Sequence, residues 1–184
     1  MLRYTLLAIA VLLAGYALLL AAFSLTSYDR TVARGEEKFY CGMDCHIAYS
    51  VQNVERTTAI GNATASGEYV VVTLRSHFDQ RTIAPWRGNS PLAPDPPELE
   101  LVDGSRRSYP LSPTGQRAWE TAHPPAHSLG DPLRPDESYE TTWVFDVPSG
   151  APSLRLFAGW HGFPSNLLIG DEATPGHRKT YFAL

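Results

Sequence analysis

The sequence begins with an apolar stretch from Tyr4 to Leu25, 22 residues without a charged side chain. As an α-helix it would be about 33 Å long, enough to span the hydrocarbon core of a bilayer. We therefore predict a transmembrane anchor within residues 1–28. The alternative is a cleaved signal peptide, whose apolar region usually has only about 7 to 15 residues. The short N-terminal tail favours a topology with residues 29–184 outside the cytoplasmic membrane, although Arg3 competes with basic residues after the helix.

One face of the predicted helix carries only small side chains. They recur at spacings of four, three and four residues: Ala10, Ala14, Ala17 and Ala21. Because lipid gives helices no hydrophobic reason to associate, small side chains favour close packing between helices in a membrane. The pattern indicates a helix-packing face. The alternative interpretation is that alanine is simply common in such helices.

After a polar tether at residues 29–46, the pattern changes to the two-residue alternation of β-strands. Runs rich in β-branched and aromatic residues predict about seven strands. They cover residues 47–52, 68–78, 99–101, 105–111, 139–147, 154–160 and 180–184. The Asp103-Gly104 pair predicts a tight hairpin turn, since such turns require positive φ angles.

The segments between these strands contain little helical pattern. Residues 83–97 and 121–135 are too rich in proline for a helix or a central strand, which predicts loops. Thr114–Ala122 predicts one short helix with Trp119 on its buried side. Many short strands with almost no helix predict an all-β fold, an antiparallel β-sandwich over residues 47–184.

Several segments of the predicted sandwich carry a resemblance to a known family. They are GEYVVVTLRSHF at 67–78, LVDG at 101–104, SYETTWVFDVP at 138–148, SLRLF at 153–157 and LLIGDEATPGHRKTYFAL at 167–184. In this order they resemble a bacterial immunoglobulin-like domain family of unknown function, found behind lipoprotein or helix anchors. The resemblance implies an immunoglobulin-like sandwich that serves as an extracytoplasmic binding or structural module. The Pro-rich loops and a cysteine motif before the first strand depart from it.

Composition and charge exclude several classes of protein. The net charge is −4, and beyond residue 28 the chain has 14 basic and 19 acidic residues, which argues against a nucleic-acid partner. The sequence has no G-x-S-x-G elbow, phosphate-binding glycine loop or H-E-x-x-H pair. We therefore predict that the protein is not an enzyme. Two cysteines cannot form a disulfide scaffold, so a hydrophobic core must hold the domain together.

Both cysteines lie in one short motif, Cys41-Gly-Met-Asp-Cys45-His46. The first interpretation is a Cys41–Cys45 disulfide in an oxidising compartment, with no cofactor. The second is a copper site formed by Cys41, Cys45, His46 and Met43, ligand types that select this metal. The C-x3-C spacing is similar to that of cytochrome oxidase subunit II and Sco-type carriers, but the first of these has a histidine where this chain has Tyr49.

The third interpretation of the motif is a covalently attached c-type haem, for which the sequence has one residue too many between the cysteines. The other histidines give weaker signals. His123 and His127 flank two prolines and are interpreted as a surface pair in a loop. We expect His177 to help to fix the last strand.

These features together predict a non-catalytic accessory subunit of a larger membrane complex, anchored in the cytoplasmic membrane of a bacterium. Its partners would be the lipid bilayer and other subunits. Trp86, Trp119 and Trp160 are candidate contact residues, with the protein core as the alternative for each. The rival hypothesis is a copper-binding carrier or electron-transfer protein that uses the cysteine motif.

Overall fold

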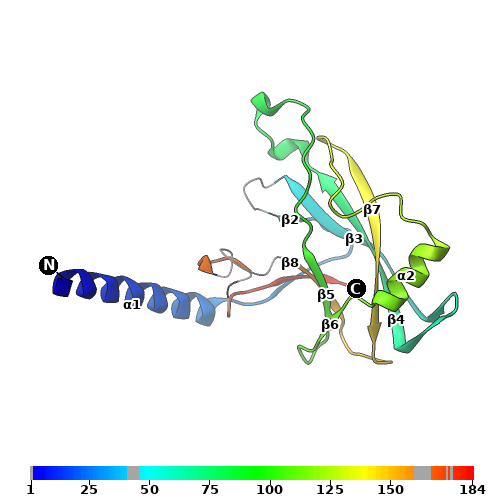
Figure 1. Cartoon of the computed structure of the whole chain (residues 1–184), viewed down its shortest axis with the longest axis horizontal. Helices are drawn as coiled ribbons and strands as arrows, with labels where there is room; N and C mark the ends of the chain where they lie inside the picture. The colour runs from blue at the N-terminus through cyan, green and yellow to red at the C-terminus, as the bar shows by residue number, and fades with distance from the viewer. Residues whose placement is uncertain (1, 41–45, 160–166, 173, 175) are drawn as a thin grey trace. The chain divides into compact units, whose positions relative to one another are not determined.

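The computed structural model describes residues 2–40, 46–159, 167–172, 174 and 176–184 (Figure 1). The chain forms two compact units. The first consists of Met1–Arg30 and Gly159–Thr180, and the second of Thr31–Ala158 and Tyr181–Leu184. The cysteine motif up to Cys45, and Trp160, lie outside the described residues.

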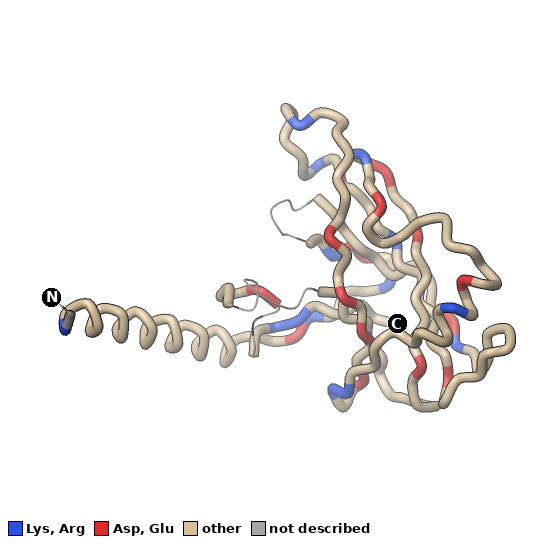
Figure 2. The backbone as a smooth tube through the Cα atoms, viewed as in Figure 1, with Lys and Arg blue, Asp and Glu red and all other residues tan. Residues whose placement is uncertain are grey.

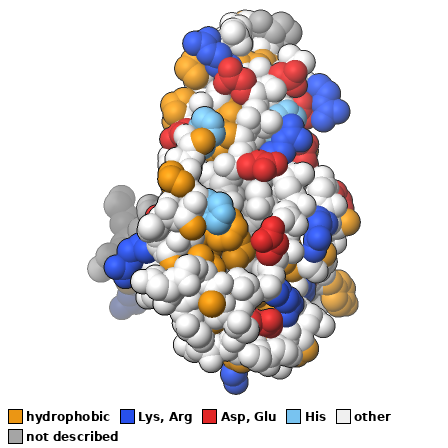
Figure 3. Space-filling view, turned by 90° about the vertical axis from the view of Figure 1, so that its right-hand side faces the viewer, with side chains coloured by type: hydrophobic (Ala, Val, Ile, Leu, Met, Phe, Trp, Pro, Cys, Tyr) orange, Lys and Arg blue, Asp and Glu red, His pale blue; other side chains and the backbone are white. Residues whose placement is uncertain are grey.

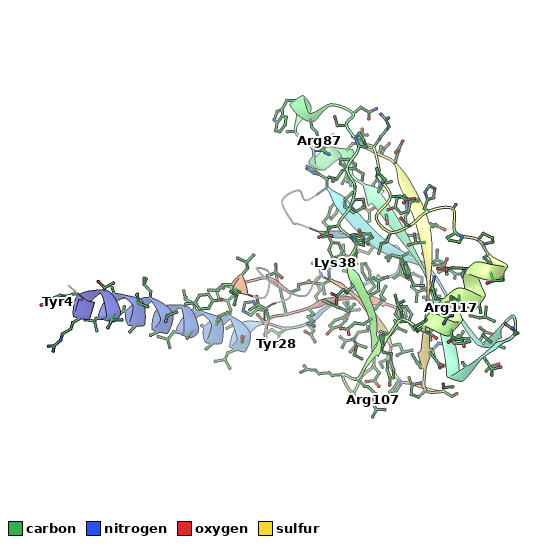
Figure 4. The ribbon with its side chains drawn as sticks, in the orientation of Figure 1. Tyr4, Tyr28, Lys38, Arg87, Arg107 and Arg117 are labelled. Carbon is green, nitrogen blue, oxygen red and sulfur yellow. The ribbon has the colours of Figure 1, made fainter. Side chains whose placement is uncertain are left out.

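The first unit contains the predicted apolar helix, α1 (Leu2–Thr26). It is long and apolar enough to cross a membrane, and the apolar stretch is not buried inside the protein. Arg3 near its start is its only charged residue (Figure 2). Tyr4 and Tyr28 lie near the two ends of the helix and are each 80% exposed (Figure 4). The helix is therefore confirmed, and its retention as an anchor stays a prediction.

Part of the C-terminal segment packs along α1 within the same unit. The partly buried residues of the helix follow one face, at Tyr16, Leu20 and Ser24. At about 100° per residue, this face lies roughly a quarter turn from the predicted alanine face. All four alanines of that face, Ala10, Ala14, Ala17 and Ala21, are exposed.

The second unit is built on two β-sheets, which confirms the predicted β-sandwich. In the described residues one sheet has the order β1-β9-β8-β5-β6 and the other the order β2-β3-β4-β7. The bounds of the first are β1 (Arg30–Val32), β9 (Thr180–Ala183), β8 (Arg155–Gly159), β5 (Glu98–Val102) and β6 (Ser108–Pro110). Those of the second are β2 (Lys38–Tyr40), β3 (Ile47–Ile60), β4 (Ala63–Phe78) and β7 (Ser138–Val147).

The core consists of the alternate, inward-facing residues of these strands. The second sheet contributes fully buried Val51, Val72, Leu74 and Phe145, and the first contributes Leu101, Leu156 and Phe182. This alternation is the pattern from which the strands were predicted. Burial of these apolar side chains supplies the main stabilising free energy of the domain.

The segment predicted as a tether also provides the short strands β1 and β2. Lys38, labelled in Figure 4, lies in β2 and is buried. Its Nζ donates a hydrogen bond to the carbonyl oxygen of Ala158 at 3.1 Å and lies 4.7 Å from the ring centre of Tyr40. A cation over an aromatic face is stabilised by the ring quadrupole, which offsets part of the cost of burying the charge.

The hairpin of β3 and β4 is much longer than the two predicted strands at 47–52 and 68–78. The strands pair without a loop longer than two residues, and Gly61 adopts φ +57° in the Gly61-Asn62 turn. Their outer halves are polar and largely exposed, because this end of the hairpin extends beyond the core. Ile60, Ala63 and Ala65 near the turn pack in a small apolar cluster with Tyr69 and Val71, but the polar residues between them hide this pattern in the sequence.

The predicted hairpin around Asp103 is confirmed as β5 and β6. Its turn is longer than the predicted two-residue turn, and the positive φ of +64° lies at Arg106, not at Gly104. The Asp103 carboxylate holds the turn together. It accepts hydrogen bonds from the N–H groups of Ser105 and Arg107 at 2.8 and 2.9 Å and from the Tyr109 hydroxyl at 2.8 Å.

These hydrogen bonds predict a loss of stability in acid. The N–H group of Arg107 is the main cause that lowers the pKa of Asp103 below its ordinary value of 3.8, and the Arg81 guanidinium lowers the pKa of Asp79. As pH falls through about 4, the unfolded chain therefore binds protons before the folded one does, and the free energy of unfolding decreases. Urea denaturation between pH 7 and pH 3 should show this decrease, and the Asp103→Asn variant should show a smaller one. Equal pH dependence in both proteins would contradict the assignment.

The predicted short helix is confirmed as α2 (Pro113–Ala122). The Ser112 hydroxyl caps it by accepting a hydrogen bond from the N–H of Gly115 at 3.2 Å, and Pro113 takes the first helical position. The helix covers the outer face of the second sheet, where Trp119 packs beside a cluster of Ile60, Tyr69, Val71 and Val144. The Pro-rich segments contain the short 3-10 turn Pro85–Arg87 and are joined by an isolated β-bridge between Leu92 and Leu133, and the 3-10 turn Gln80–Thr82 precedes the first of them.

Candidate functional site

The strand β7 lies at the edge of the second sheet. On one side it pairs with β4 from Glu68 to His77. On the other side, near its end, Ser112 and the side chain of Gln116 occupy the place of a neighbouring strand. The N–H of Ser112 donates to the carbonyl of Val144 at 2.8 Å.

The carboxamide of Gln116 hydrogen-bonds the main chain of β7 as a paired strand would. Its Nε2 donates to the carbonyl of Thr142 at 3.0 Å, and its Oε1 accepts from the N–H of Val144 at 2.9 Å. In an antiparallel strand the N–H and C=O of one residue point to the same side. The main-chain groups of Glu140 and the N–H of Thr142 therefore point toward the same open edge.

A cleft of about 330 Å³ follows this open edge. It lies between α2, the Pro-rich loop that follows α2, and β7. Its lining residues are Gln116, Trp119, Glu120, His123, Pro124, Pro125, Ala126, His127, Ser128, Glu140, Thr141, Thr142 and Trp143. Figure 3 is turned toward the side of α2 and β7 and shows hydrophobic side chains and histidines together, with acidic side chains beside them.

Aromatic contacts hold the walls of the cleft in place. The His123 ring stacks on Trp119 with 4.2 Å between ring centres, and the His127 ring stacks on Tyr139 at 4.9 Å. Trp143 donates a hydrogen bond from Nε1 to the Thr141 hydroxyl at 2.9 Å. These contacts fix the indole rings of Trp119 and Trp143, which line the cleft with their apolar faces.

The loop wall is fixed by Asp131. Its carboxylate accepts a hydrogen bond from the N–H of Ser128 at 3.1 Å and lies 3.2 Å from Nδ1 of His127. The hydroxyl of Ser128 is the main cause that lowers the pKa of Asp131. The carboxylate is therefore ionised at neutral pH, and it favours a proton on Nδ1 of His127.

The electrostatic character of the cleft is acidic. Two carboxylates, those of Glu120 and Glu140, line it, and none of its lining residues is a lysine or arginine. Glu140 is exposed, and Glu120 accepts a hydrogen bond from Nε2 of Gln116 at 2.9 Å. Carboxylates next to indole faces favour a cationic group, by charge and by cation–π attraction.

The sequence predicted only part of this site. Trp119 packs beside the core cluster and also lines the cleft, and its contact with a partner stays a prediction. His123 and His127 were interpreted as a surface pair without a site, but both line the cleft. Sequence reasoning missed Gln116 and Trp143, because a side chain that pairs with a strand edge leaves no spacing pattern.

The remaining predicted site residues lie elsewhere. The structure does not describe Cys41, Met43, Cys45 or Trp160, so the disulfide, copper and haem hypotheses stay predictions.

Two further predicted residues are described. His46 stacks on Phe78 with ring centres 5.8 Å apart. Trp86 is 88% exposed, consistent with a contact role and not with a core role. Within the part of the chain that the structure describes, no group of three or more His, Cys, Asp or Glu side chains could hold a metal ion.

A second polar cluster surrounds His77 on β4. Its Nδ1 lies 2.7 Å from Oε1 of Glu37, and its Nε2 lies 3.9 Å from Oδ1 of Asp136. The contact ties the residue before β2 to β4 across the sheet. These contacts give His77 a structural role.

No family model matches the chain, and no curated protein matches its sequence. Two solved structures are similar in fold. The secreted protein MPT63 of Mycobacterium tuberculosis is 15% identical, with 73% of this chain and 92% of that chain covered and a TM-score of 0.49. An uncharacterised β-sandwich protein of Clostridium difficile is 13% identical, with 86% and 95% covered and a TM-score of 0.46.

Proposed function

We propose that the protein is a non-catalytic accessory subunit of a membrane complex, anchored by α1 in the cytoplasmic membrane of a bacterium. Its immunoglobulin-like sandwich lies on the extracytoplasmic side. Support comes from the length and apolar surface of α1 and from the exposed tyrosines at its ends, Tyr4 and Tyr28, since tyrosine is enriched at membrane interfaces. The exposed alanine face of α1 remains the predicted contact with another transmembrane helix.

The cleft beside β7 is the proposed contact of the sandwich with its partner. The observation that carries this proposal is the open edge at Glu140 and Thr142, continued by the Gln116 carboxamide that already hydrogen-bonds the edge in the manner of a strand. An extended segment of a partner polypeptide adds to such an edge through main-chain hydrogen bonds, and neighbouring pockets take its side chains. Trp119 and Trp143 supply large rigid surfaces for these side chains.

The charge of the cleft selects the partner segment. Because Glu120 and Glu140 line the cleft and no lysine or arginine does, the segment should carry a basic side chain at this point. Charge complementarity of this kind mainly fixes the register and the association rate. The partner is therefore an extended, basic segment of another subunit, and no chemistry on a substrate is needed.

The test is isolation of the native protein in a mild detergent, with identification and quantification of the co-purifying chains. We expect stoichiometric membrane subunits, and at least a tenfold lower recovery with Glu140→Lys, since like charges across a contact cost several kcal/mol and about 1.4 kcal/mol already corresponds to a factor of ten. Glu55→Lys is the matched control, because Glu55 is an exposed glutamate on β3, outside the cleft, and it should leave recovery unchanged.

Three results of this isolation would overturn the proposal or part of it. A protein that purifies alone from native membranes is not an accessory subunit. Copper close to one atom per chain, lost in Cys45→Ser, would instead support the carrier hypothesis. Equal loss of partners in Glu140→Lys and Glu55→Lys would place the contact elsewhere than in the cleft.

A further inference from the structure

The first unit has an apolar projection beside α1. Leu167 and Leu168 are 51% and 52% exposed, although they belong to the C-terminal segment that packs against the helix. We propose that this turn is immersed in the hydrocarbon of the outer leaflet next to α1, so that the protein contacts lipid through a second element. The inference rests on the proposed role of α1 as a membrane anchor.

The contact with Tyr16 sets the depth of the turn. The Tyr16 hydroxyl donates a hydrogen bond to the carbonyl oxygen of Leu167. With the charged Arg3 at one headgroup region, a hydrocarbon core of about 30 Å takes about 20 residues and ends near Phe23. Tyr16 is seven residues before Phe23. The turn would therefore lie about 10 Å inside the hydrocarbon boundary.

The main chain of the turn is suited to an apolar medium. Irregular backbone at membrane depth is tolerated only where its polar groups are satisfied within the protein. The carbonyl of Leu167 accepts the Tyr16 hydroxyl. The carbonyl of Leu168 accepts the Thr174 hydroxyl at 2.7 Å and the N–H of Asp171 at 3.0 Å. Side-chain hydroxyls thus replace the water that a surface turn would use.

A buried histidine closes the base of the turn. His177 is only 6% exposed, and its Nδ1 accepts a hydrogen bond from the N–H of Gly170 at 3.0 Å. Its ring centre lies 6.0 Å from that of Phe23 on α1. An imidazole that accepts at Nδ1 carries its proton on Nε2, and this atom is buried with no hydrogen-bond partner among the described residues.

The neighbouring Gly176 and the carboxylate of Glu172 fit the same placement. Gly176 has φ +78°, which other residues rarely adopt, and a Cβ there would be 2.7 Å from the Ser24 hydroxyl oxygen, so a larger residue would be strained at this approach to α1. Oε1 of Glu172 accepts the N–H of Thr180 at 3.1 Å. This contact directs the carboxylate toward β9, which follows the segment, and away from Leu167 and Leu168.

Lipid explains the exposed leucines better than a protein partner does. The side chains of Leu167 and Leu168 are aliphatic, and they continue the exposed apolar surface of α1, on which Leu12 is 72% exposed. A contact for a soluble domain would carry a polar rim around its apolar centre. The occupant that fits both leucines and α1 is the acyl chain of a phospholipid.

Photocrosslinking tests this inference in the full chain, reconstituted in phosphatidylcholine vesicles. Benzoylphenylalanine replaces Leu168, Leu12 as a control within α1, or Trp86 as an exposed control in the sandwich. We expect phospholipid adducts, detected by mass spectrometry, from positions 168 and 12 and none from position 86. Each replacement affects an exposed side chain, and an unchanged melting curve checks that the protein is folded.

The three positions separate failure of the inference from failure of the anchor. Adducts from position 12 without adducts from position 168 would overturn the immersed turn and leave the anchor intact. No lipid adduct from either position would overturn both. Adducts from position 168 to protein in native membranes, with none to lipid, would show that a partner subunit covers the leucines and would also overturn the inference.

Discussion

Replacement of Gly67 by alanine is expected to lower the free energy of unfolding by about 3 kcal/mol, the upper end of the usual cost of overpacking. Gly67 lies in β4 where this strand passes the end of β7. A Cβ atom at this position would be 2.3 Å from the carbonyl oxygen of Val147 and 2.7 Å from the nitrogen of Ser149. Both are main-chain atoms, so no side chain can rotate away and the strands must separate.

The separation would also break the contacts that fix this end of the sheet. The Asp146 carboxylate accepts hydrogen bonds from the N–H groups of Ser66 and Gly67 at 2.9 and 3.3 Å. Chemical denaturation of the full chain in detergent micelles, followed by circular dichroism, measures the effect. Gly104→Ala is the control, since a Cβ there would meet its nearest atom at 3.6 Å, an ordinary contact. Similar denaturation midpoints for Gly67→Ala and Gly104→Ala would show that the main chain at Val147 does not approach Gly67 this closely.

The sequence predicted the strands whose inward-facing residues form the hydrophobic core. The first residues of the strand Ser138–Val147 alternate between exposed and buried, and a two-residue period is visible in its sequence. The outer half of the β3–β4 hairpin has only small apolar residues such as Ala63 and Ala65 facing α2, so its hydrophobic periodicity is weak. The Gly61-Asn62 pair between Ile60 and Ala63 was the available signal, because two such residues between strands favour a tight turn.

The candidate site was less predictable, because it depends on which strand is left at an edge. Strand order is a property of the whole sheet, and nothing local to Ser138–Val147 indicates that one side of the strand is open. The histidines of the Pro-rich loop were visible as a pair. Their position beside Glu140 depends on how α2 and the loop cross the edge, which the sequence pattern does not encode.

The second large loss of stability is expected from a substitution at Gly115, where α2 packs on the second sheet. A Cβ at Gly115 would be 2.7 Å from Cγ1 of Val144 and 2.9 Å from Cε1 of Tyr69, so the helix can approach the sheet this closely only with glycine. We expect Gly115→Val to lower the free energy of unfolding by about 3 kcal/mol, since its branched side chain adds further volume at the same point. The higher helix propensity of the new residue offsets only a few tenths of a kcal/mol.

The same substitution should also disrupt the cleft, because Gln116 follows Gly115 directly. Displacement of α2 moves the Gln116 carboxamide away from the Thr142 carbonyl and the Val144 N–H, which removes the hydrogen bonds that continue the edge of β7. Recovery of partner subunits should therefore fall with Gly115→Val even at a temperature where most of the protein is folded. Gly104→Val, a substitution of the same size in the turn before β6, should leave recovery unchanged. Loss of stability with full recovery would mean that the edge of β7 binds its partner without the support of α2.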